Sequence, residues 1–319
     1  MALTHDWLNA FGGAERVLAE LLRVFPGAPI YTTVHDPAGL PPEARGWDVR
    51  PSFLQRVPFA RRRHRPFLPL MPFAFESFDL SGYDVVLATA SAFAKGVLVP
   101  PETRVVCYCH TPPRYLWDQY HAQTRGVRGR AFVALAAHYL RLWDRVAADR
   151  VDTFVANSET VAQRIRTYYR REPLVVYPPV DTDRWLPDGR DPEDFLLVVS
   201  RLVPYKRVDL AVRAAARLGR PLVVVGDGPE RRRLEAIAGP TTRFLGWQPD
   251  DVVAGLYARA RAFVFPGADD FGIAPVEAQA AGRPVVAYGR GGALETVVPG
   301  VTGVHFAEQT VEAVCAAVE

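Results

Sequence analysis

Short runs of β-branched and aromatic residues alternate with segments of helical period along most of the chain. In the second half, strands are predicted over Phe195–Val199, Leu222–Val225, Ala262–Phe265 and Pro284–Ala287. Between these runs, helices are predicted over Arg207–Leu218 and, after a Gly-Asp-Gly-Pro turn, over Pro229–Ile237. Such alternation is typical of right-handed βαβ units on a parallel sheet.

The first half shows the same pattern with longer insertions. A short strand is predicted over Ala2–Leu8, and buried strands are predicted over Val85–Ala88, Val105–Tyr108 and Thr153–Ala156. Helices are predicted over Ala14–Val24 and over Glu159–Tyr169, where Ser158 has the position of an N-cap. The expected fold class is therefore α/β, with two Rossmann-like domains whose parallel sheets face each other across a cleft.

A proline-rich stretch separates the two halves. Residues 177–192 contain four prolines, which forbid regular structure and mark a linker or hinge. The predicted organisation is a first domain over residues 1–180, a linker over 181–194 and a second domain over 195–319. Because ligands of such sheets bind at the carboxyl ends of the strands, chemistry is expected in the loops that follow the strands.

Composition narrows the class of protein. A chain of 319 residues fits two α/β domains of roughly 150 residues each. The 49% hydrophobic share excludes global disorder, and no run of about 18 apolar residues predicts a membrane span. The first residues lack the pattern of a secretory signal, and three cysteines without a CxxC pair suit a reducing cytoplasm. A net charge of +3 does not indicate a nucleic-acid partner.

The strongest candidate for chemistry is the segment Phe265–Ala278, in which a strand is followed by a loop and a helix start. Pro275 has a position in the first turn of that helix, where proline is favoured, so the backbone N–H groups of Gly272–Ala274 can bind a phosphate. Asp269 in the loop and Glu277 in the first helical turn are expected to accept hydrogen bonds from sugar hydroxyls. The alternative is that both acids only complement the helix dipole.

The segment Ser200–Asp209 follows the first predicted strand of the second domain and carries two candidate cations. Arg201 and Lys206 stand on the connection to the next helix, where a guanidinium and an ammonium group can clamp a diphosphate. Lysine is rare in this chain, because Lys95 and Lys206 are the only lysines among 38 basic residues. The alternative is a pair of solvated surface charges.

Two segments of the first domain add to the candidate site. Gly12 and Gly13 follow the first predicted strand and permit close approach of a ligand to a helix N-terminus, although a plain tight turn is the alternative. They do not form the glycine pattern of a nicotinamide site. His110 stands at the tip of a predicted strand, which favours a functional histidine. Cys107 and Cys109 alternate along that strand without further close ligands, so no metal site is predicted.

The segment Arg56–Phe75 mixes five arginines with aromatic residues and prolines. This composition favours contact with an anionic membrane surface or with the phosphate of a lipid acceptor. The alternative is a solvated insertion whose aromatic side chains pack locally.

Together these motifs resemble the retaining glycosyltransferases of family GT4, which have the GT-B fold. The similarity is strongest to mannosyltransferase-like members of bacterial cell-surface polysaccharide synthesis. It runs from His5 to the last residue, and its most specific parts are Ser-Arg-Leu-Val-Pro-Tyr-Lys (200–206) and Asp-Phe-Gly-Ile-Ala-Pro-Val-Glu (270–277). The family's acidic-x7-Glu motif falls on Asp269 and Glu277, with aspartate in place of the more usual glutamate.

The resemblance implies a role for each candidate residue of the second domain. Arg201 and Lys206 hold the donor diphosphate, and Glu277 binds the ribose hydroxyls. The base is bound largely by backbone groups near Trp247. The sugar is met by Asp269 together with the backbone of Phe271, Gly272, Ile273 and Ala274.

In the first domain, the resemblance implies that Gly12 and Gly13 approach the donor phosphates and that His110 touches the sugar near the reacting carbon. The two cations of the second domain take the place of the divalent metal that other transferases need. No metal is therefore expected, and no cofactor besides the nucleotide sugar.

The implied reaction transfers a hexosyl group, mannose from GDP-mannose, to a glycan or to an acceptor linked to a lipid diphosphate. The implied place is the cytoplasm, at the inner face of the cell membrane. Family members usually continue with a helix that crosses back onto the first domain, whereas this chain stops inside a helix predicted over Gln309–Glu319, so a truncated second domain is expected. Two other functions stay open: a sugar-nucleotide 2-epimerase and a truncated, non-catalytic partner that binds a nucleotide.

Overall fold

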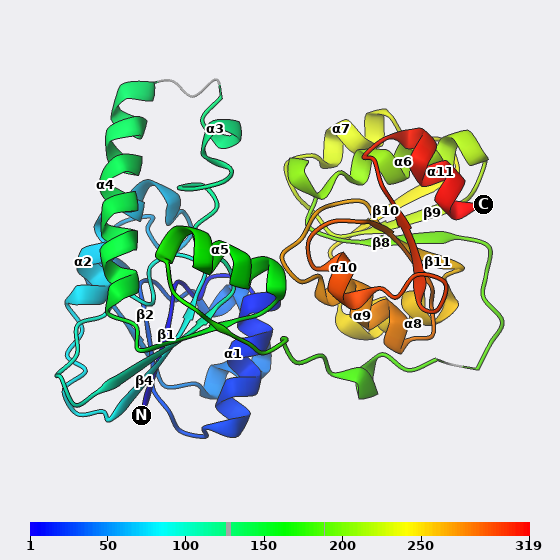
Figure 1. The fold of residues 1–319 in the computed structure, drawn as a ribbon. Helices are drawn as coiled ribbons and strands as arrows, with labels where there is room; N and C mark the ends of the chain where they lie inside the picture. Colours follow the sequence, from blue (N-terminus) through cyan, green and yellow to red (C-terminus); the bar gives the residue numbers. More distant parts are fainter. Residues whose placement is uncertain (126–128, 188) are drawn as a thin grey trace. The chain divides into compact units, whose positions relative to one another are not determined.

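The computed structural model describes residues 1–125, 129–187 and 189–319, and these residues form two compact units. The first unit is Met1–Pro179 and the second is Val180–Glu319 (Figure 1). Each unit has its own parallel sheet and its own hydrophobic core.

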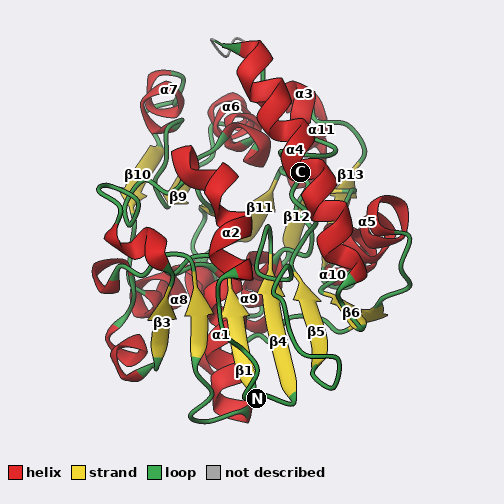
Figure 2. Ribbon diagram, turned by 90° about the vertical axis from the view of Figure 1, so that its left-hand side faces the viewer, coloured by secondary structure: helices red, strands yellow, loops and turns green. Residues whose placement is uncertain are grey.

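The described part of the first unit is built on a parallel sheet of seven strands in the order β3-β2-β1-β4-β5-β6-β7 (Figure 2). The strands are β1 (Ala2–His5), β2 (Ile30–Thr32), β3 (Val49–Pro51), β4 (Val85–Ala90), β5 (Arg104–Cys109), β6 (Thr153–Ala156) and β7 (Leu174–Val175). Successive side chains alternate between the two faces of the sheet. In β4, Val86 therefore belongs to one core cluster and Leu87 to another.

Helices of the first unit cover both faces of this sheet. On one face, α1 (Gly13–Val24) packs Val17 and Leu18 against β1 and β2. The core on the other face holds residues of α2 (Met71–Glu76), α4 (Arg130–Asp149) and α5 (Glu159–Tyr169), and the short helix α3 (Tyr120–Gln123) precedes α4. No helix of the described residues combines the length and the hydropathy that crossing a bilayer requires.

The described part of the second unit repeats the plan with a parallel sheet of six strands in the order β10-β9-β8-β11-β12-β13. The strands are β8 (Leu196–Val199), β9 (Leu222–Val225), β10 (Thr242–Gly246), β11 (Ala262–Phe265), β12 (Val285–Tyr288) and β13 (Gly303–Phe306). The helices are α6 (Val208–Leu218), α7 (Arg231–Ala236), α8 (Asp250–Arg259), α9 (Ile273–Ala280), α10 (Ala293–Thr296) and α11 (Val311–Val318). Leu196 and Leu197 of β8 belong to different cores, one on each face.

Most of the elements predicted from the hydrophobic pattern are present. The predicted bounds of β6, β9, β11 and α5 agree with the structure, and the hydroxyl of Ser158 caps α5 by accepting a hydrogen bond from Val161 N at 3.1 Å. The first strand was predicted too long: β1 ends at His5, and Leu8 forms only an isolated bridge with His35.

Two further bounds differ for local reasons. Strand β12 begins at Val285 and not at Pro284, because proline has no N–H group for the ladder; Pro284 contributes only its carbonyl, which accepts from Phe263 N at 2.9 Å. Helix α11 begins at Val311, because the hydroxyl of Thr310 caps it.

The segment predicted as a linker, residues 181–194, packs in part on the second unit. Trp185 is buried in the core there, and its ring makes an edge-on contact with Tyr257 at 5.6 Å between ring centres. Residue 188, which falls in this segment, lies outside the described residues. The division into 1–180, 181–194 and 195–319 stays a prediction.

Each sheet contains a point at which the strand order reverses. Strand β1 lies between β2 and β4, and β8 lies between β9 and β11. In doubly wound α/β sheets, ligands bind outside the carboxyl ends of the strands at such switch points. The loops after β1, β4, β8 and β11 are therefore the places in which this fold positions chemistry.

A buried ion pair ties α4 to the first unit. Lys95, in the loop after β4, contacts Asp144 of α4, and both side chains are almost fully buried. Asp144 also accepts hydrogen bonds from Trp117 Nε1 at 2.8 Å and from the Tyr169 hydroxyl at 3.1 Å. Burial alone would lower the pKa of Lys95, but the charge of Asp144 outweighs burial, so the pKa of Lys95 is raised. One of the two lysines is thus structural.

Asp144→Asn leaves the Lys95 ammonium group buried without a counter-charge. We expect the free energy of unfolding of the first unit to fall by about 3–5 kcal/mol, measured by urea unfolding with tryptophan fluorescence. The matched control is Asp149→Asn on the same helix, where the pair with Arg145 is largely exposed and is worth about 0.3–0.5 kcal/mol. Equal losses in the two variants would contradict the structural role of the buried pair.

Candidate functional site

The loops after β8 and β11 meet through an ion pair. Lys206 ends the 3-10 turn Pro204–Lys206, and its ammonium group contacts the carboxylate Oδ2 of Asp269. Both side chains are largely shielded from water, at 18% and 14% exposure. The other carboxylate oxygen of Asp269, Oδ1, is buried and has no hydrogen-bond partner among the described residues. A buried acceptor without a donor is costly, and a ligand hydroxyl would satisfy it.

Close backbone contacts bring these loops together, and they require glycine. A Cβ atom at Gly267 would lie 2.9 Å from Cα of Lys206. From the loop after β12, Gly292 N donates a hydrogen bond to Asp269 O at 2.9 Å. Its neighbour Gly291 has a φ of +68°, and a Cβ atom there would lie 2.2 Å from the same carbonyl oxygen. The backbone around Asp269 is therefore held on two sides without room for side chains.

The N-terminus of α9 comes directly after this loop. Gly272, with a φ of +89°, leads the chain into the helix, and no side chain of the described residues caps it. Pro275 is the third residue of α9 and lies in the first turn, as predicted. The N–H groups of Ile273 and Ala274 have no partner within the helix, and a helix N-terminus of this kind favours a phosphate group.

Glu277 lies deeper in the helix than predicted. It is the fifth residue of α9 and not part of the first turn, so its interaction with the helix dipole is weak. The side chain is buried at 7% exposure, and Oε2 accepts a hydrogen bond from the Tyr257 hydroxyl at 3.2 Å. A carboxylate held in this way is oriented before a ligand binds.

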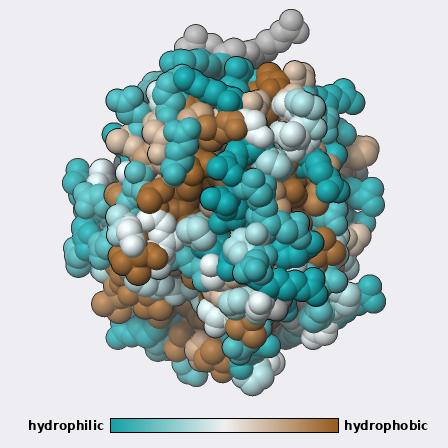
Figure 3. All heavy atoms as spheres, turned by 90° about the vertical axis from the view of Figure 1, so that its right-hand side faces the viewer, coloured by the Kyte–Doolittle hydropathy of each residue, from teal (hydrophilic) through white to brown (hydrophobic). Residues whose placement is uncertain are grey.

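Of the three other predicted donor residues of the second unit, Phe271 is buried, whereas Arg201 and Trp247 are exposed. Arg201 lies in the loop after β8, and its guanidinium group forms no ion pair within the part of the chain that the structure describes. Trp247 follows β10 and is 75% exposed. Figure 3 shows that hydrophobic residues on the face viewed there lie in patches between hydrophilic ones. Arg201 thus offers a positive charge that forms no ion pair with a carboxylate of the described residues.

In the first unit, a carboxylate fixes the glycine pair. Gly12 is the N-cap of α1, which begins at Gly13, and Gly12 N donates a hydrogen bond to Oε2 of Glu15 at 2.8 Å. The other oxygen of Glu15 lies 3.3 Å from Nε2 of His5, whose Nδ1 lies 2.6 Å from the hydroxyl of Thr89. Burial raises the pKa of Glu15, but the hydrogen bonds with His5 and Gly12 and the charge of His5 outweigh burial, so the pKa is lowered.

A second carboxylate organises the loop after β4. Asp6 is buried directly after β1 and accepts hydrogen bonds at 2.6–2.8 Å from the N–H groups of four consecutive residues, Ser91, Ala92, Phe93 and Ala94. His110 follows β5, at the carboxyl end of the strand, and its N–H donates to Ala90 O at 2.8 Å. The ring of His110 makes an edge-on contact with the ring of Tyr108, with 5.4 Å between the ring centres. The tips of β1 and β4 are thus joined by the Asp6 carboxylate, and those of β4 and β5 by a backbone hydrogen bond.

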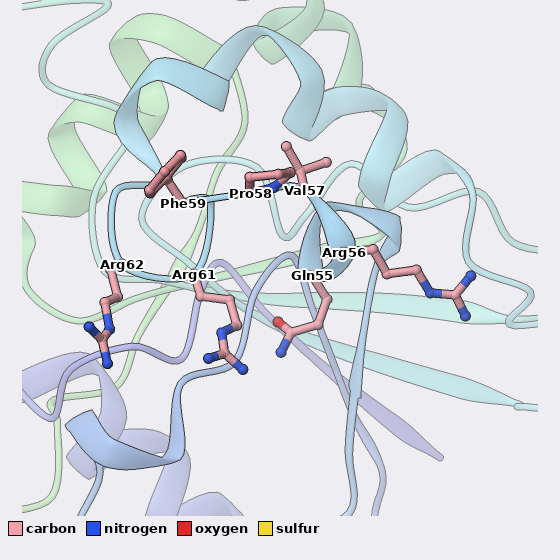
Figure 4. A pocket seen from close by; sticks show the side chains of 7 residues that line it. All are labelled: Gln55, Arg56, Val57, Pro58, Phe59, Arg61 and Arg62. Atoms are coloured by element: carbon pink, nitrogen blue, oxygen red, sulfur yellow. The ribbon is translucent and has the colours of Figure 1, made fainter.

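A shallow hollow of about 310 Å³ lies among the arginines after β3. It is lined by Gln55, Arg56, Val57, Pro58, Phe59, Arg61 and Arg62. In Figure 4 the side chains of Gln55, Arg61 and Arg62 point the same way, and that of Arg56 points away from them. Asn9, in the loop after β1, donates a hydrogen bond to Arg61 O at 2.9 Å, which ties this segment to the loop that carries the glycine pair.

No cluster of three or more His, Cys, Asp or Glu side chains that could hold a metal ion occurs within the described residues. Metal-independent chemistry stays a prediction from the resemblance.

Two parallel-sheet Rossmann-like units define the class of this protein as GT-B, and solved structures share its fold. Sucrose-phosphate synthase from Thermosynechococcus elongatus matches with a TM-score of 0.76 at 18% identity, over 100% of this chain and 88% of that one. HepE from Anabaena, solved in complex with UDP and glucose, matches with a TM-score of 0.73 at 19% identity, over 99% and 88%.

Sequence comparison gives the family. The profile described as Glycosyltransferase Family 4 matches residues 11–184, and the profile described as Glycosyl transferases group 1 matches residues 181–319. The chain therefore belongs to glycosyltransferase family 4.

Two curated relatives come from Mycolicibacterium smegmatis. A GDP-mannose-dependent alpha-mannosyltransferase is 33% identical over 184 residues, which are 56% of this chain and 48% of the relative. A D-inositol 3-phosphate glycosyltransferase is 32% identical over 185 residues, which are 50% of this chain and 43% of the relative. The matched part of the chain spans about half the length of these relatives.

The sequence predictions missed the residues that hold the site loops in place: Asp6, Glu15, Tyr257, Gly267, Gly291 and Gly292. A signal existed for some of them. The spacing Gly12-x-x-Glu15 is that of a capping box, and the Gly-Arg-Gly-Gly run 289–292 follows a predicted strand, where glycine marks close approach of another backbone. Asp6 and Tyr257 carry no local signal, because their partners are distant in the sequence.

Gly267→Ala places a Cβ atom against the backbone of Lys206, so we expect a loss of about 1–3 kcal/mol in the free energy of unfolding of the second unit. The matched control is Gly255→Ala inside α8, where a Cβ atom meets nothing within 4 Å. That substitution should raise the free energy of unfolding by about 0.5–1 kcal/mol. Urea unfolding measures both, and effects of the same sign would contradict the close approach.

The lowered pKa of Glu15 predicts a dependence of stability on pH. Relative to an unfolded value of about 4.3, the folded state favours the ionised carboxylate. The stability contributed is therefore present above about pH 4.3 and is lost as the pH falls through the lower folded-state pKa. Glu15→Gln should flatten this acid limb in urea unfolding curves between pH 7 and pH 3, whereas Glu20→Gln, at a half-buried position of α1, should not. Parallel curves for wild type and Glu15→Gln would overturn the assignment.

Proposed function

We propose that this chain is a retaining, metal-independent glycosyltransferase that moves mannose from GDP-mannose to a glycan or to a lipid-linked acceptor. The observation that carries the proposal is the shielded Lys206–Asp269 pair directly before the N-terminus of α9. Membership of glycosyltransferase family 4 supports the reaction class. The relative described as a GDP-mannose-dependent alpha-mannosyltransferase supports the donor.

The charges of the loops after β8 and β11 and of the N-terminus of α9 suit a sugar diphosphate. A diphosphate competes with Asp269 for the Lys206 ammonium group, and Arg201 adds a positive charge from the same loop. The N–H groups of Ile273 and Ala274 add donors at the positive end of a helix. As the bond between the sugar and the diphosphate breaks, negative charge develops on the leaving phosphate oxygen and positive charge on the sugar, and fixed donors of this kind stabilise the transition state by about 2.7–4 kcal/mol each.

Asp269 is assigned to binding a hydroxyl of the donor sugar. Its Oδ1 is a buried acceptor without a donor among the described residues, and a sugar hydroxyl would supply the donor. Glu277 is assigned to the ribose hydroxyls by the family resemblance, and the Tyr257 hydroxyl holds its carboxylate in place. Trp247 is assigned to the base, together with backbone groups beside it. In the first unit, Gly12 and Gly13 are assigned to the phosphates and His110 to the sugar near the reacting carbon.

The proposed step balances without a protein nucleophile. The bond between sugar C1 and the phosphate oxygen breaks, and its electron pair goes to the diphosphate. The bond between C1 and the acceptor oxygen forms on the same face of the sugar, and the acceptor proton passes to the leaving phosphate oxygen. The products are the glycosylated acceptor and GDP.

Lys206→Ala removes the charge that faces the diphosphate, so we expect the affinity for GDP to fall about tenfold to a hundredfold. Calorimetry with GDP, UDP and GDP-mannose measures the affinities, and the proposal expects GDP to bind more tightly than UDP. The control is Arg213→Ala, an exposed arginine of α6 in the same unit, which should leave the affinity unchanged. Unchanged binding by Lys206→Ala would overturn the assigned diphosphate site.

Turnover separates the proposed function from its alternatives. With GDP-mannose and a lipid-diphosphate glycan extract, mannose should appear in the glycan fraction only when the extract is present. A changed sugar nucleotide without any acceptor would indicate a 2-epimerase. A third outcome is that this chain, and also a version extended at its C-terminus, binds GDP but shows no turnover. That outcome would indicate a non-catalytic partner.

A further inference from the structure

The longest helix of the first unit, α4, carries a row of apolar side chains that face water. The row, here called the α4 stripe, consists of Phe132, Leu135, Tyr139, Leu142 and Val146, of which Leu135 is 68% and Leu142 58% exposed. Spacings of three and four residues place them on one face over about 21 Å of helix. The opposite face is also apolar and is buried in the core through Ala137, Leu140, Trp143 and Ala147. The stripe is therefore not needed for packing within the unit.

Helix α2 lies beside α4 and, with the residue that precedes it, carries exposed apolar side chains. Trp143 Nε1, on the inner face of α4, donates a hydrogen bond to Glu76 Oε1 at 2.8 Å, which joins α4 to the end of α2, and Figures 1 and 2 both show the two helices side by side. Tyr139 of the stripe lies close enough to Glu76 that burial and the carboxylate charge raise its pKa. Leu70 and Phe73, next to and within α2, are exposed as well.

The segment that leads to α2 is strongly positive. Residues 51–75 contain no Asp or Glu, and all five arginines of the segment, Arg56, Arg61, Arg62, Arg63 and Arg65, are exposed. Within the described residues, Arg62 alone among them pairs with a carboxylate, that of Asp36 at 3.6 Å.

Phe59 stands in the middle of these arginines and is 80% exposed. Its φ of +66° is rare for a bulky residue, and the turn is closed by Arg62 N and Arg63 N, which donate to Phe59 O. The turn therefore presents an aromatic ring to solvent within an arginine-rich segment.

We propose that the α4 stripe, together with Phe59, Leu70, Phe73 and the five arginines, is a docking surface for an anionic lipid bilayer. An amphipathic helix whose apolar face meets the acyl chains, beside arginines that meet anionic headgroups, lies in the interface of a membrane and does not cross it. Each arginine near such a surface strengthens binding about fivefold.

A second copy of the chain fits the surface less well. The spacing of the stripe would suit a paired helix, but such pairing is set by opposite charges beside the apolar row. Along α4, Asp144 is buried against Lys95 and Asp149 is paired with Arg145. Two copies would thus meet with arginines on both sides and few acids to offset them, whereas an anionic bilayer complements the charge.

The test is flotation of the purified chain with vesicles of phosphatidylcholine alone or with 30% phosphatidylglycerol. We expect binding to the anionic vesicles at least tenfold stronger than to the neutral ones, and weaker in 0.5 M than in 0.1 M NaCl. Leu135→Glu with Leu142→Glu, and separately Arg61→Glu with Arg63→Glu, should each lower partitioning at least tenfold. The matched control is Val24→Glu with Leu174→Glu, two exposed aliphatic residues of the same unit outside this surface, and it should bind as wild type.

Several outcomes would overturn the proposal. The proposal is wrong if the wild-type chain does not bind anionic vesicles. It is also wrong if the control variant loses as much binding as the stripe variant. Release of the protein by 10 mM inorganic phosphate, with the stripe variant still bound, would indicate a free-phosphate site. A wild-type dimer in light scattering that becomes a monomer in the stripe variant, without vesicle binding by either, would indicate a second copy as the occupant. All variants change exposed residues, and urea unfolding checks that they are folded.

Discussion

The contact between Lys206 and Asp269 is the constraint on which the candidate site of the second unit depends. Neither charge is well hydrated, so each needs the other, and removing one would leave the other shielded and unpaired. The pair forms only because the loops after β8 and β11 approach through glycine, with Gly267 against the Lys206 backbone. One oxygen of Asp269 is used by the pair, and the second is kept as an acceptor. The site is therefore organised before any ligand arrives.

The loops of the first unit are also held in place, but by a different kind of contact. These loops are fixed by carboxylates that accept hydrogen bonds from backbone N–H groups: the buried Asp6 for the loop after β4 and the largely shielded Glu15 for the turn at Gly12. A carboxylate that accepts hydrogen bonds from several backbone N–H groups can hold a loop in place without close packing of one backbone segment against another. Loops braced by side chains and loops braced by glycine contacts respond differently to substitution. In the first unit the loops are held by carboxylates, which titrate. In the second unit they are held by close backbone contacts that are possible only because glycine has no Cβ atom.

The hydrophobic pattern predicted much of the fold, because a strand buried on both faces needs a short apolar run wherever it stands. Strands β9 and β11 have the predicted bounds for that reason. The arrangement of the site could be predicted only in part. The position of Lys206 and Asp269 in loops after strands follows from the pattern, but their contact depends on the order of the sheet. Helix α4 was not predicted, since two apolar faces on one helix obscure the helical period.

The two faces of α4 have separate physical roles. The inner face carries Asp144, which holds Lys95 and the indole of Trp117, in the segment that follows His110. The outer face carries the α4 stripe, whose side chains are largely exposed to water in the part of the unit that the structure describes. Loss of the inner contacts costs stability, whereas the outer side chains, already in water, contribute little to folding. A chain that needed α4 only as a brace would gain nothing from large apolar residues on the solvent side. Their cost in solubility is offset only by a partner that covers them, and the neighbouring arginines select one that is negatively charged.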